Sequence, residues 1–135
     1  MRVFLDANIL FSGAQPGSRM RAFLDVLLAH AEGITNAYAV EEARRNLELK
    51  FPTTLADFMA LVRRCELVPA LVVELPVALK AKDAPILGGA IAGRATHLLT
   101  GDQTDFGHLF GKTVQGVQIV SPRMMADELV KLGWL

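Results

Sequence analysis

The chain has 135 residues, of which 52% are hydrophobic and 21% are charged, and its mean hydropathy is +0.34. This length and composition favour a single domain over residues 1–135 and argue against disorder, and one cysteine excludes an internal disulfide. Fourteen basic and fourteen acidic residues give zero formal charge, so net charge does not indicate a polyanionic partner. We see no targeting segment and no uncharged apolar run of the roughly 18 residues that cross a bilayer, which predicts a cytoplasmic protein with no membrane partner.

The first half of the chain is expected to alternate strands with helices. In order, we expect a strand at 2–5, a loop at 12–17, a helix from Ser18 to His30, a strand at 34–35, a helix at 37–50, a helix from Pro52 to about Arg64, and a strand from Leu67 to Val73. Ser18 is suited to cap its helix, whose apolar face is expected to hold Ala22, Phe23, Val26 and Leu27.

The second half continues the alternation. The expected elements are a helix over 83–96, strands at 97–100 and 118–120, and a final helix over 121–132. Asp83 is a plausible N-cap, because Pro85 then lies in the first turn, where its missing N–H costs nothing. Alternating strands and helices predict a parallel sheet covered on both faces, which is a three-layer α/β/α sandwich.

Three aspartates fall at matching places in this pattern. Asp6 follows the first strand, Asp83 lies in the segment after the third, and Asp102 follows the fourth. In open parallel sheets, ligands bind at the carboxyl ends of the strands, where these carboxylates would meet. Clustered carboxylates repel one another unless a hard cation such as Mg²⁺ or Mn²⁺ binds them, and the lack of a His/Cys cluster argues against zinc. Taken singly, each aspartate is equally an ordinary turn or capping residue, so the pattern leaves both interpretations open.

Several segments together resemble the PIN-domain family. The opening Val-Phe-Leu-Asp-Ala-Asn-Ile-Leu resembles the family's first motif, and the segment from Asp83 to the Thr-Gly-Asp that ends at Asp102 resembles its second half. The segment from Ala39 to Leu47 resembles the helix that carries a single functional glutamate. The resemblance implies an α/β/α sandwich whose members are usually ribonucleases, many of them VapC-type toxins of toxin–antitoxin pairs. It therefore implies RNA as substrate, a possible cognate antitoxin, and a homodimer.

The resemblance also assigns residues to the site. It implies a catalytic set of Asp6, Glu42, Asp83 and Asp102, metal binding by Asp6, Asp83, Asp102 and Asp105, and supporting hydrogen bonds from Asn8 and Thr100. Adjacent helical residues point about 100° apart, so only one of Glu41 and Glu42 can face the site. The resemblance favours Glu42, whose face also carries Asn46, whereas Glu41 is expected to pair with Arg45 on the surface.

The implied reaction is metal-assisted hydrolysis of an RNA phosphodiester that leaves 5′-phosphate and 3′-hydroxyl ends. A bound ion lowers the pKa of its water and neutralises charge on the phosphate. Basic side chains near the acids are candidates for binding RNA, although each is also explained as part of a solvated surface: Arg44, Arg45, Lys50, Lys80 and Lys82.

Three alternatives are weaker. A phosphatase of the haloacid-dehalogenase type needs a second aspartate two residues after the first, where this chain has Asn8. A response-regulator receiver domain needs an acidic pair after the first strand and a lysine after the last, and neither is present. A PIN scaffold that binds nucleic acid or protein without catalysis is disfavoured by the complete set of acids.

Overall fold

A six-stranded sheet forms the centre of the molecule. The structure is a computed structural model that describes residues 1–70 and 74–135. The strands are β1 (Arg2–Leu5), β2 (Glu32–Thr35), β3 (Glu66–Leu67), β4 (His97–Leu99), β5 (Thr113–Val114) and β6 (Val117–Val120). They lie in the order β3-β2-β1-β4-β6-β5, and all neighbours are parallel except the β5–β6 pair. The expected sheet and sandwich are therefore confirmed, with one antiparallel strand at an edge.

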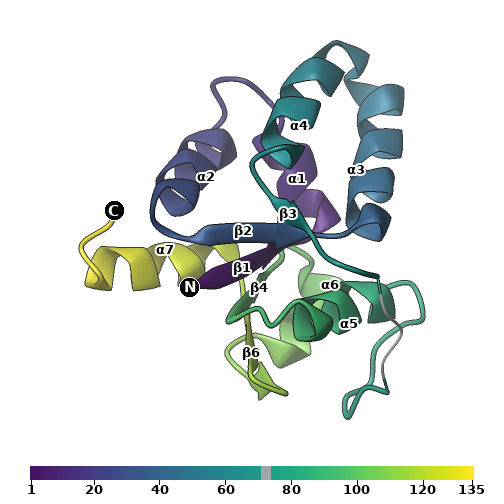
Figure 1. Cartoon of the computed structure of the whole chain (residues 1–135), viewed down its shortest axis with the longest axis vertical. Helices are drawn as coiled ribbons and strands as arrows, with labels where there is room; N and C mark the ends of the chain where they lie inside the picture. The colour runs from purple at the N-terminus through teal and green to yellow at the C-terminus, as the bar shows by residue number, and fades with distance from the viewer. Residues whose placement is uncertain (71–73) are drawn as a thin grey trace.

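Helices cover both faces of the sheet. They are α1 (Ala7–Gly13), α2 (Arg19–His30), α3 (Ala37–Lys50), α4 (Leu55–Val62), α5 (Ala84–Ala92), α6 (Gln103–Phe106) and α7 (Pro122–Lys131), with short 3₁₀ turns at Pro52–Thr54 and Gly107–Leu109. Figure 1 shows α1 to α4 gathered on one side of the sheet, with α5 and α6 on the other. Beyond α7, Trp134 stacks on His30 of α2 with ring centroids 5.1 Å apart. Among the described residues, no helix is long and apolar enough to cross a membrane.

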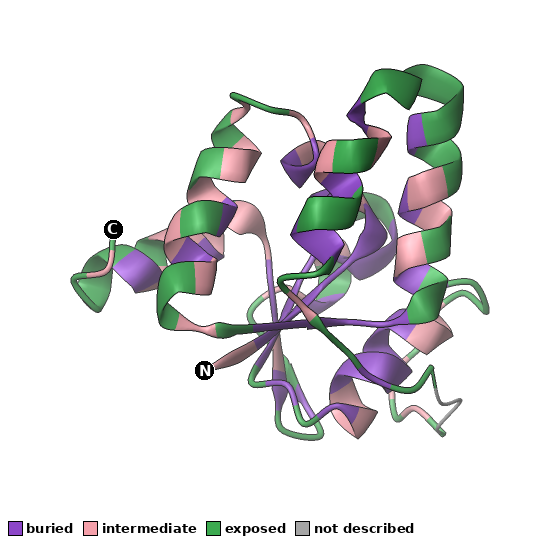
Figure 2. Ribbon diagram, turned by 45° about the horizontal axis from the view of Figure 1, so that its top comes forward, coloured by how far each residue is buried: buried purple, intermediate pink, exposed green. Residues whose placement is uncertain are grey.

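The core follows the central strands and the inward faces of the helices. Val3, Phe4 and Leu5 of β1 are completely buried, as a strand between two neighbours and two helical layers should be. Figure 2 shows the buried residues along the sheet and on the sheet-facing sides of the helices. In α2 the fully buried residues are Leu24 and Leu27, so the expected inclusion of Ala22 is wrong: Ala22 is exposed.

The chain reverses its direction across the sheet between β1 and β4. From β1 the chain passes outward to β2 and β3, and it then returns through α5 to β4 on the other side of β1. At such a switch point, helices leave neighbouring strands toward opposite faces, and a crevice opens at the carboxyl ends of the strands. Asp6 follows β1 and Thr100 follows β4 at this point. The backbone N–H of Asp6 donates to Leu99 O at 3.1 Å, which joins the two strand ends.

Several expected elements differ from the structure. Residues 7–13 form α1, which was not predicted, and the expected loop begins only after it. The third strand was expected over 67–73, but β3 covers only Glu66–Leu67. Positions 71–73 of that expectation lie outside the described residues. The helix expected over 83–96 ends at Ala92, and β5 was not predicted. A two-residue turn with positive φ at Gln115 (45°) and Gly116 (86°) joins β5 to β6, the backbone that a tight hairpin requires.

Candidate metal centre

A cleft of about 330 Å³ opens at the carboxyl ends of β1 and β4. Its lining consists of Asp6, Ala7, Asn8, Phe11, Glu42, Asn46, Lys50, Lys82, Asp83, Gly101 and Asp102. The four carboxylates in this lining exceed the two lysines by two negative charges when all are ionised. The four residues expected to be catalytic therefore share one concave surface, although they lie far apart in the sequence.

Asp6 is the most thoroughly anchored acid of the cleft. Its carboxylate accepts hydrogen bonds from the Ala7 backbone N–H at 2.6 Å, the Thr100 hydroxyl at 2.8 Å and the Asn8 amide at 3.1 Å. Burial raises the pKa of Asp6 to about 6, helped by nearby Glu42, while the hydrogen bonds from Thr100 and Ala7 act in the opposite direction. Asn8 and Thr100 thus lie where the resemblance placed them, holding Asp6 at the end of β1.

Asn8 and Thr100 also hold the segment that carries Asp102. The Gly101 backbone N–H donates to Asn8 Oδ1 at 2.8 Å, and the Asp102 N–H donates to Thr100 Oγ1 at 3.1 Å. The Asn8 amide is within 3.3 Å of the same hydroxyl oxygen. One network therefore fixes the ends of β1 and β4 relative to each other, so Asp6 and Asp102 have a set relative position before any ligand binds.

Asp83 occupies the N-cap position of α5 but does not cap the helix. Within residues 1–70 and 74–135, its side chain makes no capping hydrogen bond, and its Oδ2 is buried without a hydrogen-bond partner. Asp83 as a whole is only 7% exposed. Burial, followed by the side-chain interaction with Asp105 and the charges of Asp105 and Asp102, raises the pKa of Asp83 to about 7, while the charge of Lys82 acts in the opposite direction. The capping interpretation of this residue is wrong, and an unpartnered buried carboxylate oxygen is costly unless a ligand binds it.

Asp102 and Asp105 stand on the short helix α6. Asp102 Oδ1 accepts the Asp105 backbone N–H at 3.0 Å and so caps α6, and this short helix places the Asp105 carboxylate near those of Asp83 and Asp102. The Asp105 carboxylate lies 2.9 Å from Lys80 Nζ and 3.0 Å from Lys82 Nζ. These two lysines hold the pKa of Asp105 well below its usual range. Asp105, which the resemblance adds to the metal-binding acids, therefore lies beside Asp102, although it already has two ammonium partners.

Asp83, Asp102 and Asp105 together fit a metal ion. One ligand atom from each lies within 4.8 Å of the others. Two unit charges at that separation repel by about 3 kcal/mol at an effective dielectric constant of about 20. Carboxylate oxygens are the ligands that Mg²⁺ and Mn²⁺ prefer, and the unpartnered Asp83 Oδ2 supplies a free one. Asp6, which was expected among the ligands, lines the same cleft but is not part of this close group.

The two neighbouring glutamates of α3 have different surroundings. Glu42 lines the cleft together with Asn46, which is one turn further along the same face. Glu41 instead binds Arg44, with Oε1 at 2.7 Å from Nη2. The expected surface pair between Glu41 and Arg45 is therefore wrong in its partner. Arg44 also binds Glu48 at 2.7 Å, so its guanidinium is already neutralised by two acids.

The basic residues expected to bind RNA divide into two groups. Lys50 and Lys82 line the cleft, and Lys80 reaches Asp105 beside it. Arg44 and Arg45 belong to α3 but not to the cleft lining. The three lysines are therefore better placed than the two arginines to meet a phosphate at the acids.

Asn36 is a positioning residue that the sequence analysis did not select. It follows β2, caps α3 by accepting the Ala39 N–H at 3.0 Å, and donates to Pro85 O at 3.1 Å. It thereby ties the start of α5, and Asp83 with it, to the end of β2. A Cβ at Gly89 would collide with the Asn36 amide, so this glycine permits the close approach of α5. The available signal was a polar residue at a strand end, as at Asp6 and Asp102.

Comparison with known proteins gives a fold relationship at low sequence identity. No protein-family model matches the chain, and no curated protein matches it. Among solved structures, it is similar to a chain in the crystal structure of VapBC2 from Rickettsia felis bound to a DNA fragment from their promoter. The TM-score is 0.67 at 15% identity, covering 90% of this chain and 98% of that chain. Nearly the whole chain therefore shares its fold with a component of that complex.

Proposed function

We propose that the protein is a divalent-metal-dependent ribonuclease that hydrolyses RNA phosphodiester bonds. The observation that carries this proposal is the group formed by Asp83, Asp102 and Asp105, in which a buried carboxylate oxygen has no partner. Such a group is stabilised by Mg²⁺ or Mn²⁺, and phosphate commonly completes the coordination of these ions. The shared fold with a chain of the VapBC2 complex supports the same assignment.

The acidic residues of the cleft have different proposed roles, according to where each one lies. Asp83, Asp102 and Asp105 would hold the ion, which when bound supplies an activated water and neutralises charge developing on the phosphate. Asp6, fixed by Asn8 and Thr100, keeps its carboxylate directed at the cleft. Catalysis here rests on positioning and electrostatics, because the enclosed acids and their hydrogen bonds are in place before substrate arrives.

The remaining polar groups orient the substrate. Glu42 and Asn46 extend the polar wall of the cleft along α3. Lys50 and Lys82 are exposed cations at its edge, suited to phosphates on either side of the scissile bond. The lysines thus attract the RNA strand electrostatically, and one of its phosphates lies against the acidic residues.

Cleavage of a labelled single-stranded RNA tests the proposal. We expect cleavage with Mg²⁺ or Mn²⁺, loss of cleavage in excess EDTA, and recovery when the metal is restored. Asp102→Asn should abolish cleavage, while the matched control Asp127→Asn, an exposed acid on α7, should not. Cleavage that persists after chelation would overturn the metal mechanism. Metal binding without any cleavage would favour the non-catalytic binding module, and hydrolysis of a phosphomonoester alone would favour the phosphatase.

We further propose that the protein acts as the toxin of a toxin–antitoxin pair and forms a homodimer. The toxin assignment is supported by the fold shared with a chain of VapBC2, a complex bound to a DNA fragment from its promoter, and the homodimer is what the PIN-domain resemblance implies. Expression of the protein in bacteria should arrest growth, and Asp102→Asn should relieve the arrest. Coexpression with a small neighbouring gene that encodes a DNA-binding segment should relieve it as well. Growth arrest by Asp102→Asn equal to that of the unchanged protein would contradict the toxin assignment.

A further inference from the structure

Two phenylalanines at the edge of the cleft are not enclosed by the core. Phe11 of α1 lines the cleft and is only partly buried, and Phe51, just after α3, is 46% exposed. Their ring centroids are 6.0 Å apart and the planes are tilted by 50°. The core phenylalanines Phe4, Phe58 and Phe106 are by contrast completely buried. An aromatic ring left at the border of a polar cleft offers a surface to a ligand that enters it.

A lysine lies over the inner ring. Lys50 Nζ is 5.7 Å from the centroid of Phe11, within the range of a cation–π contact. Lys50 follows Glu42 and Asn46 at steps of four residues, so the three share one face of α3 along the cleft. At 1.5 Å per residue, Lys50 is about 12 Å along the helix from Glu42. The wall of the cleft therefore changes from carboxylate to amide to ammonium with increasing distance from the acids.

An aromatic face combined with a cation matches the chemistry of a nucleotide that has left a helical stack. Unpaired bases stack on aromatic side chains, and neighbouring phosphates bind cations. A base within a duplex is stacked on both sides and cannot reach such a ring. As an exposed contact alone, the pair formed by Lys50 and Phe11 would contribute little to stability. The pair lies beside the acidic group, however, so it can bind the part of a substrate that adjoins the phosphate held there.

We propose that Phe11 and Lys50 form a subsite for an unpaired nucleotide next to the phosphate held at the acids. The base replaces the ammonium group over the Phe11 ring, with Phe51 supporting the ring from the side, and Lys50 then binds the adjacent phosphate. This inference rests on the proposed function and narrows it: the substrate is a single strand, accepted with little preference for base identity because every base has a π-face.

Binding measurements test the subsite separately from catalysis. The parent protein is Asp102→Asn with Mn²⁺ present, and the probes are labelled 12-residue strands of RNA and DNA and the matching RNA duplex, followed by fluorescence anisotropy. Phe11→Leu, which keeps an apolar side chain but removes the aromatic face, should weaken binding of both single strands about tenfold. The matched control Phe23→Leu, a partly buried ring on α2, should bind as the parent does.

Lys50→Met gives a second readout that does not depend on core packing, because Lys50 is exposed. Its log–log salt dependence for single strands should fall by about 0.7, the loss of one phosphate contact. Duplex binding should be unchanged in both variants. The subsite is overturned if Phe11→Leu and Lys50→Met both bind single strands as the parent does. It is also overturned if the losses are equal on duplex RNA, or confined to RNA or to DNA, because neither group reads base pairing or the sugar.

The outcomes separate this inference from the proposed function. If the unchanged protein cleaves RNA but Phe11→Leu and Lys50→Met bind normally, the subsite is wrong and the ribonuclease assignment stands. If the two variants lose single-strand affinity but the unchanged protein cleaves nothing, the subsite stands and the ribonuclease assignment is wrong. Thermal unfolding of each variant in the same buffer confirms that the compared proteins are folded.

Discussion

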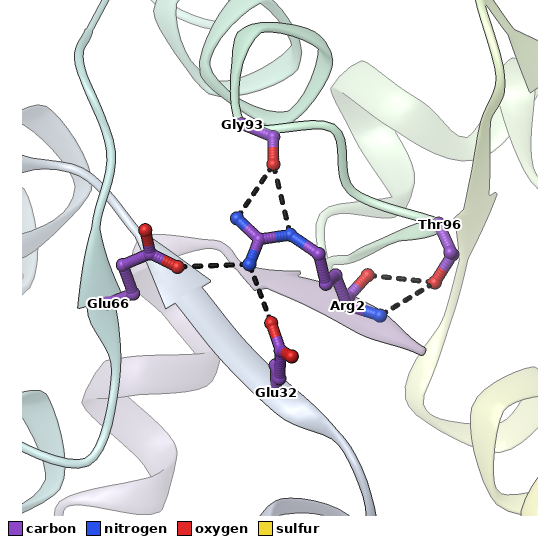
Figure 3. A network of polar contacts seen from close by, with 5 residues as sticks. All are labelled: Arg2, Glu32, Glu66, Gly93 and Thr96. Carbon is purple, nitrogen blue, oxygen red and sulfur yellow. Dashed lines mark hydrogen bonds and ion pairs between the residues drawn. The ribbon is translucent and has the colours of Figure 1, made fainter.

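The acidic side chains at the two ends of the central sheet differ in whether a cation neutralises them. At the amino end, the Arg2 guanidinium binds Glu32 of β2 at 2.6 Å and Glu66 of β3 at 3.0 Å. It also donates twice to Gly93 O at the end of α5, at 2.9 and 3.2 Å. Figure 3 shows one arginine at the centre of this network, with its acids on the two neighbouring strands. Each glutamate there has a cation, and the network joins three strands to a helix.

At the carboxyl end, the acids outnumber the cations. Only Asp105 has direct ammonium partners, whereas Asp6 has neutral hydrogen-bond donors and Asp83 Oδ2 has none. A fold that neutralises its acids at one end and leaves them exposed to mutual repulsion at the other is stabilised by the first arrangement and destabilised by the second. We therefore propose that the amino end serves folding and that the carboxyl end binds a cationic ligand.

Asp83→Asn should give the largest effect. We expect cleavage to fall at least about 100-fold, because several kcal/mol of charge stabilisation depend on the ion. In EDTA at pH 7.5, the same variant should be more stable than the unchanged protein, on the order of 1–3 kcal/mol, because an unsatisfied buried charge is removed. Urea unfolding measures the second effect, with Asp127→Asn as the matched surface control. A variant that is both inactive and less stable would show that Asp83 supports the fold.

The stability of the metal-free protein should fall as the pH rises from about 4 to 7. The pKa of Asp6 is raised to about 6 and that of Asp83 is also raised, so in this window the folded chain binds more protons than the unfolded chain. For Asp6 the shift corresponds to about 3 kcal/mol. The pKa of Asp105 is lowered, so its contribution changes only below this window.

Metal should oppose this fall in stability and offset most of the part that comes from Asp6. Mn²⁺ at 100 times its dissociation constant should add about 2.7 kcal/mol at pH 7.5, and much less at pH 4.5, where the acids bind protons instead. Urea unfolding at pH 4.5, 6 and 7.5, with EDTA or Mn²⁺, measures both trends. Equal stability at all three pH values in EDTA would mean that the carboxyl end carries no uncompensated charge.

Glu42→Gln and Glu41→Gln should differ in their effects on cleavage, because the two glutamates lie on different faces of α3. Glu42 lines the cleft, so its neutral variant should lower the cleavage rate by roughly tenfold or more and weaken metal binding. Glu41 is bound to Arg44 on the exposed surface, where solvent screens the pair, so its variant should leave both stability and cleavage almost unchanged. Single-turnover cleavage and a Mn²⁺ titration compare the pair. The reverse order of effects would place Glu41, not Glu42, at the site.

The sequence predicted elements whose pattern is strong and local. The helix over 37–50 coincides with α3, Ser18 caps α2 as expected, and the last helix begins after Ser121, close to its expected start. The seven-residue α1 was not predicted, because its short apolar run is too brief to show a helical period. The strand β5 was not predicted either, because two residues and a Gln-Gly turn give little signal beside the usual Asn-Gly.

The residues expected at the site lie together, but the sequence did not predict which of them are closest. Asp6, Asp83 and Asp102 were expected to meet from their positions relative to the strands, and Glu42 from the family resemblance, and all four line one cleft. Which carboxylates lie closest depends on side-chain partners that no pattern encodes. Thr100, Asn8 and the Ala7 N–H hold Asp6 in place, while the turn of α6 brings Asp105 close to Asp83.

Arg2→Met should have the smallest effect on cleavage and so mark the amino end as structural. The variant keeps an apolar stem but loses two ion pairs and two hydrogen bonds to Gly93 O. Both glutamates are more than half exposed, so the pairs themselves contribute little, and the bonds to the carbonyl carry much of the loss.

We expect a loss of about 1–2 kcal/mol of stability in urea unfolding for Arg2→Met, with cleavage per folded molecule unchanged. Arg123→Met, an exposed arginine on α7, is the matched control and should change neither quantity. Salt at 1 M should remove only the ion-pair share of the difference, because screening acts on the exposed charges and leaves the hydrogen bonds to Gly93 O in place. A loss of cleavage comparable to that of Asp83→Asn would mean that the two ends of the sheet are coupled, since none of the side-chain partners of Arg2 shown in Figure 3 lines the cleft.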